Sequence, residues 1–190
     1  MSMTESELLE LVERLGSILR AEQRKTGIAA PLQPVHYQVL SYLQRCNRYS
    51  NTPAAVAEYL GSTKGTVSQT LGVLERNGLV DKRRDEKDRR LVHVVLTDRG
   101  RKLVSGGEAR QVLDRAVAAL GNGEIDAATG VLKQLLRQVQ RANDFKTFEP
   151  CRTCRHLLHE GDRRFRCGLT REALEPDETL QICHEHAVKA

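Results

Sequence analysis

Apolar residues in the first quarter of the chain recur at three- and four-residue intervals, the spacing that is typical of amphipathic helices. One such stripe predicts a helix over residues 4–24, and a second predicts a helix over about 35–46. Gly27 and the two prolines that follow it predict a loop between these helices. The polar segment 47–51 predicts a turn. The chain is therefore expected to begin with two helices, the second of which ends in a turn.

Two start signals predict a closely spaced pair of helices after this turn. The Thr-Pro pair at 52–53 favours a helix start, and the short helix that it opens reaches Leu60. Thr63 is a good cap for a longer helix over 64–77, and a glycine follows each of the two helices. Two helices joined by a short turn that contains glycine form a helix-turn-helix.

A β-hairpin is expected directly after this pair. Leu79-Val80 and the segment 91–96 are rich in β-branched residues and predict two short strands. The ten residues between them, 81–90, are all charged and are expected to form a tip outside the core. A hairpin in this position is a wing.

Helical periodicity returns from Thr97, with Gly106-Gly107 expected to weaken or bend the helix. A Gly-Asn-Gly turn at 121–123 leads to a last helix, and a linker over about 143–149 follows. The fold class is mainly α with a small β-hairpin wing (α+β). The expected parts are an N-terminal helix and loop, the winged domain, further helices and a cysteine-rich tail, over residues 1–34, 35–100, 101–145 and 146–190.

The positive charge of the chain is concentrated before the tail. The formal net charge is +5; residues 1–148 hold 23 Lys and Arg against 17 Asp and Glu, whereas residues 149–190 hold 7 against 8. A polyanion is therefore expected to bind the first part. Aromatic residues make up only 4% of the chain, which argues against a base-stacking platform for single strands.

A cytoplasmic location without membrane association is expected. The first residues are acidic where a signal peptide needs positive charge, and no apolar stretch approaches the length of a membrane span. Thiols stay reduced in that compartment, so a group of cysteines is more typical of a metal or redox site than of disulfides.

Four of the five cysteines lie in the last forty residues, with the spacing Cys151-x2-Cys154-x12-Cys167-x15-Cys183. Four thiolates suit a tetrahedral zinc ion, which is the expected occupant. An iron–sulfur cluster on the same four cysteines is the alternative. His186, three residues after the last cysteine, leaves a site of three cysteines and one histidine open.

The role of this site has several interpretations. The metal can supply the folding energy that a segment of about forty residues rarely provides for itself, or it can sense oxidant or iron status. The tail can also be a module that docks a partner such as RNA polymerase. Catalysis is not expected, because the chain lacks phosphate-binding and hydrolase motifs, and no His-x-Glu precedes the Cys-x2-Cys pair. Cys46 stands alone and is expected to be buried.

Five short motifs give the chain a more specific likeness. They are Ala57-Glu58-Tyr59-Leu60-Gly61, Thr66-Val67-Ser68, Leu74-Glu75-Arg76-Asn77-Gly78-Leu79-Val80, Asp88-Arg89-Arg90 and Val95-Leu96-Thr97-Asp98-Arg99-Gly100. Their order and spacing within residues 35–104 resemble the winged helix-turn-helix of the MarR family of bacterial transcriptional regulators. The resemblance implies a homodimer held by the first and last helices, a pseudo-palindromic double-stranded DNA operator, and most often repression.

The resemblance also implies a small-molecule effector, often aromatic, between the dimerisation helices and the winged domain. His36, Tyr37 and Tyr42 lie in that region, but on the second helix they are expected to be packing residues.

The start of the second helix of the pair is expected to read DNA in the major groove. Its candidate contacts are polar: Thr63, Lys64, Thr66, Ser68 and Gln69. Gly65 and Gln69 depart from the Ser and Arg that are common in the family. At the wing, the resemblance implies that Arg89 or Arg90 enters the minor groove while Asp88 holds the tip through an ion pair.

Overall fold

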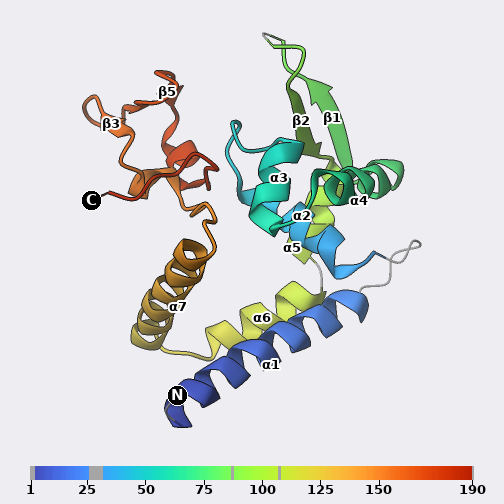
Figure 1. The fold of residues 1–190 in the computed structure, drawn as a ribbon, viewed down its shortest axis with the longest axis vertical. Helices are drawn as coiled ribbons and strands as arrows, with labels where there is room; N and C mark the ends of the chain where they lie inside the picture. The colour runs from blue at the N-terminus through green and yellow to red at the C-terminus, as the bar shows by residue number, and fades with distance from the viewer. Residues whose placement is uncertain (1–2, 26–31, 87, 107, 190) are drawn as a thin grey trace.

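The computed structural model describes residues 3–25, 32–86, 88–106 and 108–189, and Figure 1 shows their arrangement. Helices α1 (Met3–Lys25) and α6 (Glu108–Ala118) lie side by side at one end of the molecule. The winged domain and the cysteine-rich tail lie beyond them, and α7 (Asn122–Ala142) leads from α6 up to the tail. We call residues 32–106 the head and residues 146–189 the tail.

The head contains four helices and one hairpin. Helices α2 (Pro34–Arg45), α3 (Pro53–Leu60) and α4 (Lys64–Arg76) pack together, and α5 (Asp98–Gly106) packs against α2. Pro34 is the first residue of α2 and not part of the loop before it, because its fixed φ suits the first helical turn. The predicted loop around Gly27 falls largely outside the described residues.

The two predicted helix starts are confirmed. The Thr52 side chain accepts the backbone N–H of Ala55 at 3.2 Å, and the Thr63 side chain accepts that of Thr66 at 3.2 Å. Each cap satisfies a donor that the helix leaves unpaired. Gly61 closes α3 with a φ of 58°, a left-handed conformation that costs glycine little.

The core of the head is formed by side chains from α2, α3, α4 and both strands. Val39, Leu40, Ala55, Val56 and Leu74 are fully inaccessible to solvent. Tyr42 is also fully buried, and its hydroxyl donates to the carbonyl oxygen of Ser50 at 2.7 Å. His36, Tyr37 and Tyr42 are thus packing residues, as expected.

The hairpin extends further into the charged segment than predicted. Strand β1 (Val80–Arg84) pairs antiparallel with β2 (Val92–Leu96), with Arg84 opposite Val92. Residues 81–84 were expected in the tip, but they belong to strand β1. Their charged side chains stay exposed to solvent while the partner strand β2 carries the apolar side chains, so the charges do not prevent strand pairing. Only the part of the tip after Arg84 lies outside the ladder.

Two other predicted boundaries shift. Of the helix predicted after Thr97, the structure describes α5 up to Gly106 and α6 from Glu108, and the second of the two glycines expected to weaken it lies outside the described residues. Of the predicted turn at 121–123, only Gly121 precedes α7, where it is the N-cap and its N–H donates to the Glu124 carboxylate at 2.8 Å. The carboxylate satisfies a donor at the start of the helix, so the helix begins early.

The tail folds around a small sheet. Strands β3 (Leu157–His159), β4 (Phe165–Cys167) and β5 (Ala173–Leu174) form an antiparallel sheet in that order. Short 3₁₀ turns at Cys151–Thr153 and Pro176–Leu180 flank it. Cys151, Leu157 and Leu174 form its small buried core.

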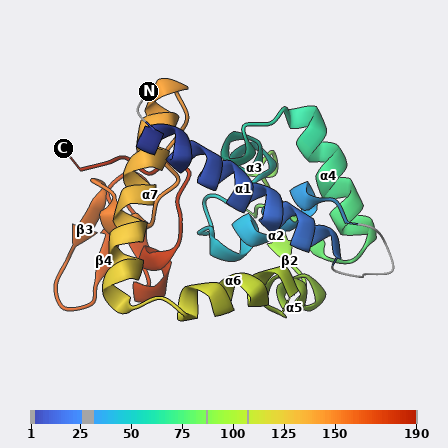
Figure 2. The same cartoon turned by 90° about the horizontal axis from the view of Figure 1, so that it is seen from below.

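The helices outside the head expose much apolar surface. Leu8, Leu9, Leu11, Val12, Leu15 and Ile18 of α1 are each at least 39% exposed, and so are Val131, Leu132, Leu136 and Val139 of α7. Figure 2 shows α1 and α7 running along the underside of the molecule. In the part of the chain that the structure describes, none of the helices is both long and apolar enough to cross a membrane.

We expect Gly100→Ala to destabilise the head by about 1–3 kcal/mol. A Cβ at this position would lie 2.1 Å from the carbonyl oxygen of Leu79, which already accepts the N–H of Thr97 and so is held in place. The matched control is Gly72→Ala in α4, whose Cβ would meet nothing closer than the Arg76 guanidinium at 3.5 Å. In urea unfolding, Gly72→Ala should be stabilising by up to about 1 kcal/mol. Equal stability of the two variants would contradict the packing described here.

Candidate nucleic-acid interface and cysteine cluster

The first turns of α4 present a row of polar side chains to solvent. Thr63, Lys64, Thr66, Ser68 and Gln69 are all exposed, whereas Val67 and Thr70 turn inward to the core. The Thr63 and Thr66 hydroxyls lie 2.9 Å apart. Helical spacing therefore separates the candidate contact residues from the packing residues of the same helix.

The tip of the wing is organised by two aspartates. Asp85 accepts the backbone N–H of Asp88 at 2.7 Å, and Asp88 accepts that of Arg90 at 3.0 Å. The Asp88 carboxylate also lies 3.5 Å from the Arg90 guanidinium, so the two side chains form an ion pair. The Arg90 side chain is 95% exposed, which leaves it available to a ligand in spite of this contact.

The base of the wing is tied to the head by a histidine that sequence reasoning missed. Nδ1 of His93 lies 2.6 Å from the Asn51 side-chain oxygen, and Nε2 lies 3.1 Å from the Asp85 carboxylate. The backbone N–H of Val94 also donates to the carbonyl oxygen of Asn51 at 2.7 Å. A single histidine in a strand carries no sequence signal for such a link, because its partners are 8 and 42 residues away.

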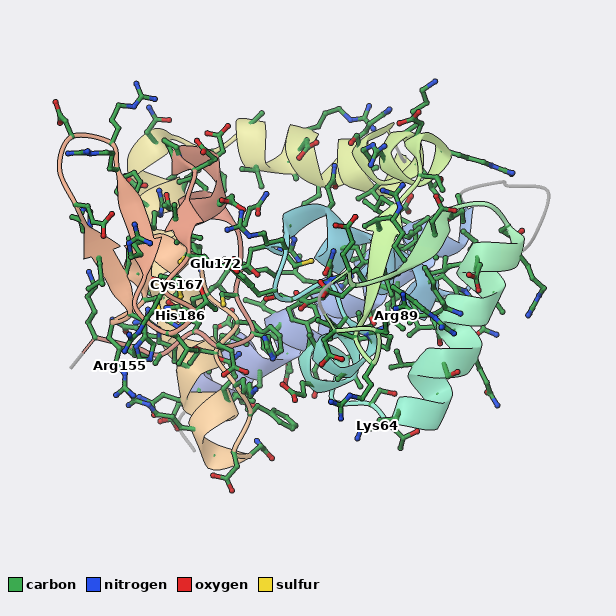
Figure 3. All side chains as sticks on the ribbon, turned by 90° about the horizontal axis from the view of Figure 1, so that it is seen from above. Lys64, Arg89, Arg155, Cys167, Glu172 and His186 are labelled. Carbon is green, nitrogen blue, oxygen red and sulfur yellow. The ribbon has the colours of Figure 1, made fainter. Side chains whose placement is uncertain are left out.

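Basic side chains gather on α4 and the wing. They are exposed, and they comprise Lys64, Lys82, Arg83, Arg84, Arg89 and Arg90. Figure 3 shows Lys64 and Arg89 on the same side of the molecule, far from the tail. Lys82 is paired with Glu75 at 2.7 Å and is the most neutralised of the group. A polar helix beside a basic hairpin is an arrangement that can contact bases and phosphates together.

The four tail cysteines come together in one region. Cys151, Cys154 and Cys183 are buried, and Cys167 is half-buried against the same small core. Burial raises the pKa of Cys151 to about 12, with further contributions from the nearby thiols of Cys183, Cys154 and Cys167. As the side chains stand, however, no three His, Cys, Asp or Glu groups among the described residues are close enough to hold a metal ion.

Backbone contacts within the tail hold each of these four cysteines in place. Cys151 donates to Gln181 at 3.0 Å, and Cys183 donates to Glu149 at 3.1 Å. Cys154 donates to Cys151 at 2.9 Å, and Cys167 lies opposite Leu157 in the sheet. Residues up to 32 positions apart in sequence are thus brought to one small core by the tail's own backbone.

His186 is engaged by two threonines. Its Nδ1 lies 2.7 Å from the Thr147 hydroxyl, and its Nε2 lies 3.0 Å from the Thr153 hydroxyl. Because both ring nitrogens have partners, the arrangement favours four cysteines over three cysteines and His186 as a ligand set. His184 differs, because its Nδ1 is buried and has no hydrogen-bond partner among the residues that the structure describes.

The tail is attached to the head by backbone and aromatic contacts. Asn47 donates to Ile182, and Ile182 donates to Arg45, both at 2.9 Å. Phe148 is buried against Tyr42 and Tyr59, with ring centroids 5.9 and 5.3 Å away. The tail is therefore a packed extension of the head.

Charged side chains add to this attachment at two further places. Glu149 accepts from Arg137 of α7 at 2.6 Å, and the bound guanidinium lowers the pKa of this carboxyl. Lys146 bridges Glu58 of α3 and Glu185 of the tail at 3.0 and 3.5 Å. The tail thus contacts the head and α7 together.

Cys46 belongs to the head and not to the group of tail thiols. It is buried at the C-terminus of α2, as predicted, and burial raises its pKa to about 12. Its backbone bridges to Ile182 of the tail. A buried thiol with a raised pKa is a poor nucleophile, so a packing role suits it.

Comparison with known proteins finds a match to the MarR family over part of the head. A family model described as "MarR family" matches residues 30–91. The transcriptional repressor MprA of Escherichia coli (strain K12) is 24% identical over 136 residues, which cover 70% of this chain and 77% of that protein. The four tail cysteines lie outside the residues matched by the family model.

Solved structures share the fold. Staphylococcus aureus MepR in its DNA-binding conformation aligns with a TM-score of 0.61 and 23% identity, over 70% of this chain and 98% of that one. Streptococcus pneumoniae FabT in complex with DNA aligns with a TM-score of 0.58 and 22% identity, over 73% and 96%. At this identity the likeness establishes the fold alone.

We expect Cys167 to be the first cysteine alkylated and Cys46 the last when the metal-free, folded protein is treated with iodoacetamide at pH 8. The thiolate is the reactive form, and burial disfavours it most at Cys46 and Cys151, whereas Cys167 is half-buried. Mass spectrometry of timed digests gives the order. The denatured protein is the control, in which all five should react alike, and early modification of Cys46 in the folded chain would contradict its placement.

Proposed function

We propose that this chain, whose segment 30–91 matches the MarR family, is a transcriptional regulator that binds double-stranded DNA through α4 and the wing. The observation that carries the proposal is the pairing of exposed polar side chains at the start of α4 with a fully exposed arginine at the wing tip. An α-helix fits the major groove, and an arginine suits a narrow minor groove.

The proposed DNA contacts of α4 and of the wing differ in their chemistry. Gln69 can form a paired hydrogen bond with adenine, while Thr63, Lys64, Thr66 and Ser68 supply donors to bases or phosphates. At the wing, Arg89 or Arg90 enters the minor groove and Asp88 orients Arg90 through its two contacts. FabT, which shares this fold, was solved in complex with DNA, and this supports DNA as the partner.

The DNA-binding form is a homodimer. Exposed apolar side chains run along α1 and α7, and contiguous apolar surface on a protein marks an interaction site. A second copy of the chain is the occupant that these helices fit, since a two-fold dimer would present two α4 helices about one DNA turn, roughly 10 bp, apart. The operator is then a pseudo-palindrome, and repression is the mode of action in keeping with the MprA relative.

We expect Arg90→Ala to weaken operator binding several-fold and to lower the slope of log affinity against log salt by about 1 per wing. The lost arginine removes one phosphate or minor-groove contact without touching the core, since the side chain is 95% exposed. The measurement is fluorescence anisotropy with a labelled operator duplex at several salt concentrations.

The matched control is Arg155→Ala, which removes the same charge from the tail. Figure 3 shows Arg155 at the opposite end of the molecule from Arg89 and Lys64. This variant should bind DNA like the wild type. If both substitutions weakened binding equally, the effect would be one of net charge, and the wing would not be the contact.

The tail adds a four-thiolate metal site made of Cys151, Cys154, Cys167 and Cys183. Their shared location and the occupied state of His186 support this ligand set. Zinc is the proposed occupant because small closed sites of four thiolates are typical zinc sites, and an iron–sulfur cluster on the same cysteines is the alternative. These four cysteines would hold the ion as thiolates, and their sulfurs would have to stand closer together than they do.

We expect protein purified without air to contain about one zinc per chain and to be colourless. Cys154→Ser should lose most of this metal, whereas Cys46→Ser should keep it, because Cys46 is outside the proposed ligand set. Elemental analysis and the visible absorption spectrum are measured on the same samples. A brown protein with iron and sulfide would establish the cluster alternative, and equal metal content in both variants would refute the site.

A further inference from the structure

The proposed metal site shares a short turn of the head with the wing. This turn, residues 47–51, connects α2 to α3 and was predicted from the sequence as a polar turn with no assigned partners. Its two halves face different partners: Asn47 and Ser50 contact the tail beside Cys183, and Asn51 contacts strand β2. The turn is therefore in contact with both proposed binding elements.

On the tail side, the turn contacts the residues before and after the last cysteine. The N–H of His184 donates to the Ser50 hydroxyl at 2.9 Å, and that hydroxyl donates to the Asn47 side chain at 2.6 Å. The backbone N–H of Asn47 also donates to the carbonyl oxygen of Ile182. Head residues thus help to hold the backbone on both sides of Cys183.

On the wing side, the same turn is bonded to the strand that carries the hairpin. Asn51 binds Val94 through its carbonyl oxygen and His93 through its side chain, at 2.7 and 2.6 Å. His93 in turn lies 3.1 Å from the Asp85 carboxylate, which accepts the N–H of Asp88. A series of contacts therefore runs from His184, the residue after Cys183, through the turn to the aspartate that orients Arg90.

The turn has little freedom to absorb a displacement. Ser50 and Asn47 are buried, and the carbonyl oxygen of Ser50 is held by the Tyr42 hydroxyl at 2.7 Å. Asn47 is also held through its backbone by Ile182, the residue before Cys183. Packed interiors transmit strain because they have few alternative arrangements. A shift of Cys183 toward a bound ion would consequently be passed to residues 47–51.

We infer that the thiolate site of the tail regulates DNA binding, because metal occupancy at Cys183 is transmitted through the turn at 47–51 to His93 and the wing tip. This regulation rests on the proposed function for its effect on DNA, but the mechanical link itself does not require DNA. The turn is bonded to Cys183's neighbours on one side and to β2 on the other, so its packed residues form a contiguous path between the two sites.

The test measures the link directly in the full chain. Hydrogen exchange of β1 and β2 is followed by mass spectrometry in zinc-loaded protein and in protein stripped with a chelator. We expect loading to slow exchange in both strands of the wild type, and we expect the difference to shrink in Asn51→Ala, which removes the side-chain bond to His93 but leaves the cysteines. His93→Leu breaks the same bond from the strand and serves if Asn51→Ala unfolds.

The matched control is Asn77→Ala, which removes a side-chain hydrogen bond to Val73 within the head but off this route. It should keep the wild-type response to zinc. Protection that rises in the tail but not in β1 and β2, or an equal response in Asn51→Ala and Asn77→Ala, would overturn the inference.

Operator affinity of the loaded and stripped protein completes the experiment. We expect the two forms of the wild type to differ by about fivefold or more, a coupling of ordinary size between two sites. Equal affinity of the two forms would overturn the regulation. Absence of operator binding in both forms, with wing exchange still responsive to zinc, would overturn the proposed function and leave the link between tail and wing standing.

Discussion

The turn between α2 and α3 is the constraint on which the rest of the structure depends. Its backbone and side chains are shared by three partners: the core through Tyr42, the wing through Asn51, and the tail through Asn47 and Ser50. Buried polar groups are costly unless paired, and this turn pairs its groups with elements distant in sequence. The turn thereby positions the wing and the tail relative to α2 and α3, although the turn itself is polar.

The head and the tail are stabilised by different interactions. The head buries a core of aliphatic side chains from three helices and two strands. The tail has only a few apolar residues at its centre, so its order depends on backbone contacts with the head, on the Phe148 ring packed between two tyrosines, and on ion pairs to α3 and α7. A small segment of this kind normally needs a metal or a partner, and here the head supplies part of that support.

The positions proposed to contact DNA and the positions that hold the fold alternate within the same elements. In α4, Ser68 and Gln69 face solvent between the buried Val67 and Thr70, and in the hairpin the charged β1 lies against the apolar β2. Changes at the exposed positions can therefore alter DNA preference without loss of the core. The exposed apolar faces of α1 and α7, where we propose that a second copy binds, likewise lie apart from the proposed DNA contacts.

The sequence by itself determined the helix starts at Thr52 and Thr63, the winged arrangement, the burial of Tyr42 and Cys46, and the grouping of four cysteines, because caps, periodicity and residue type act locally. Only the tertiary structure decided that β1 continues through Arg84, that His186 is held by two threonines, and that His93 and Ser50 link the wing to the tail. These features depend on partners up to 134 residues apart, and the local sequence around each residue carries no signal for a partner at such a separation.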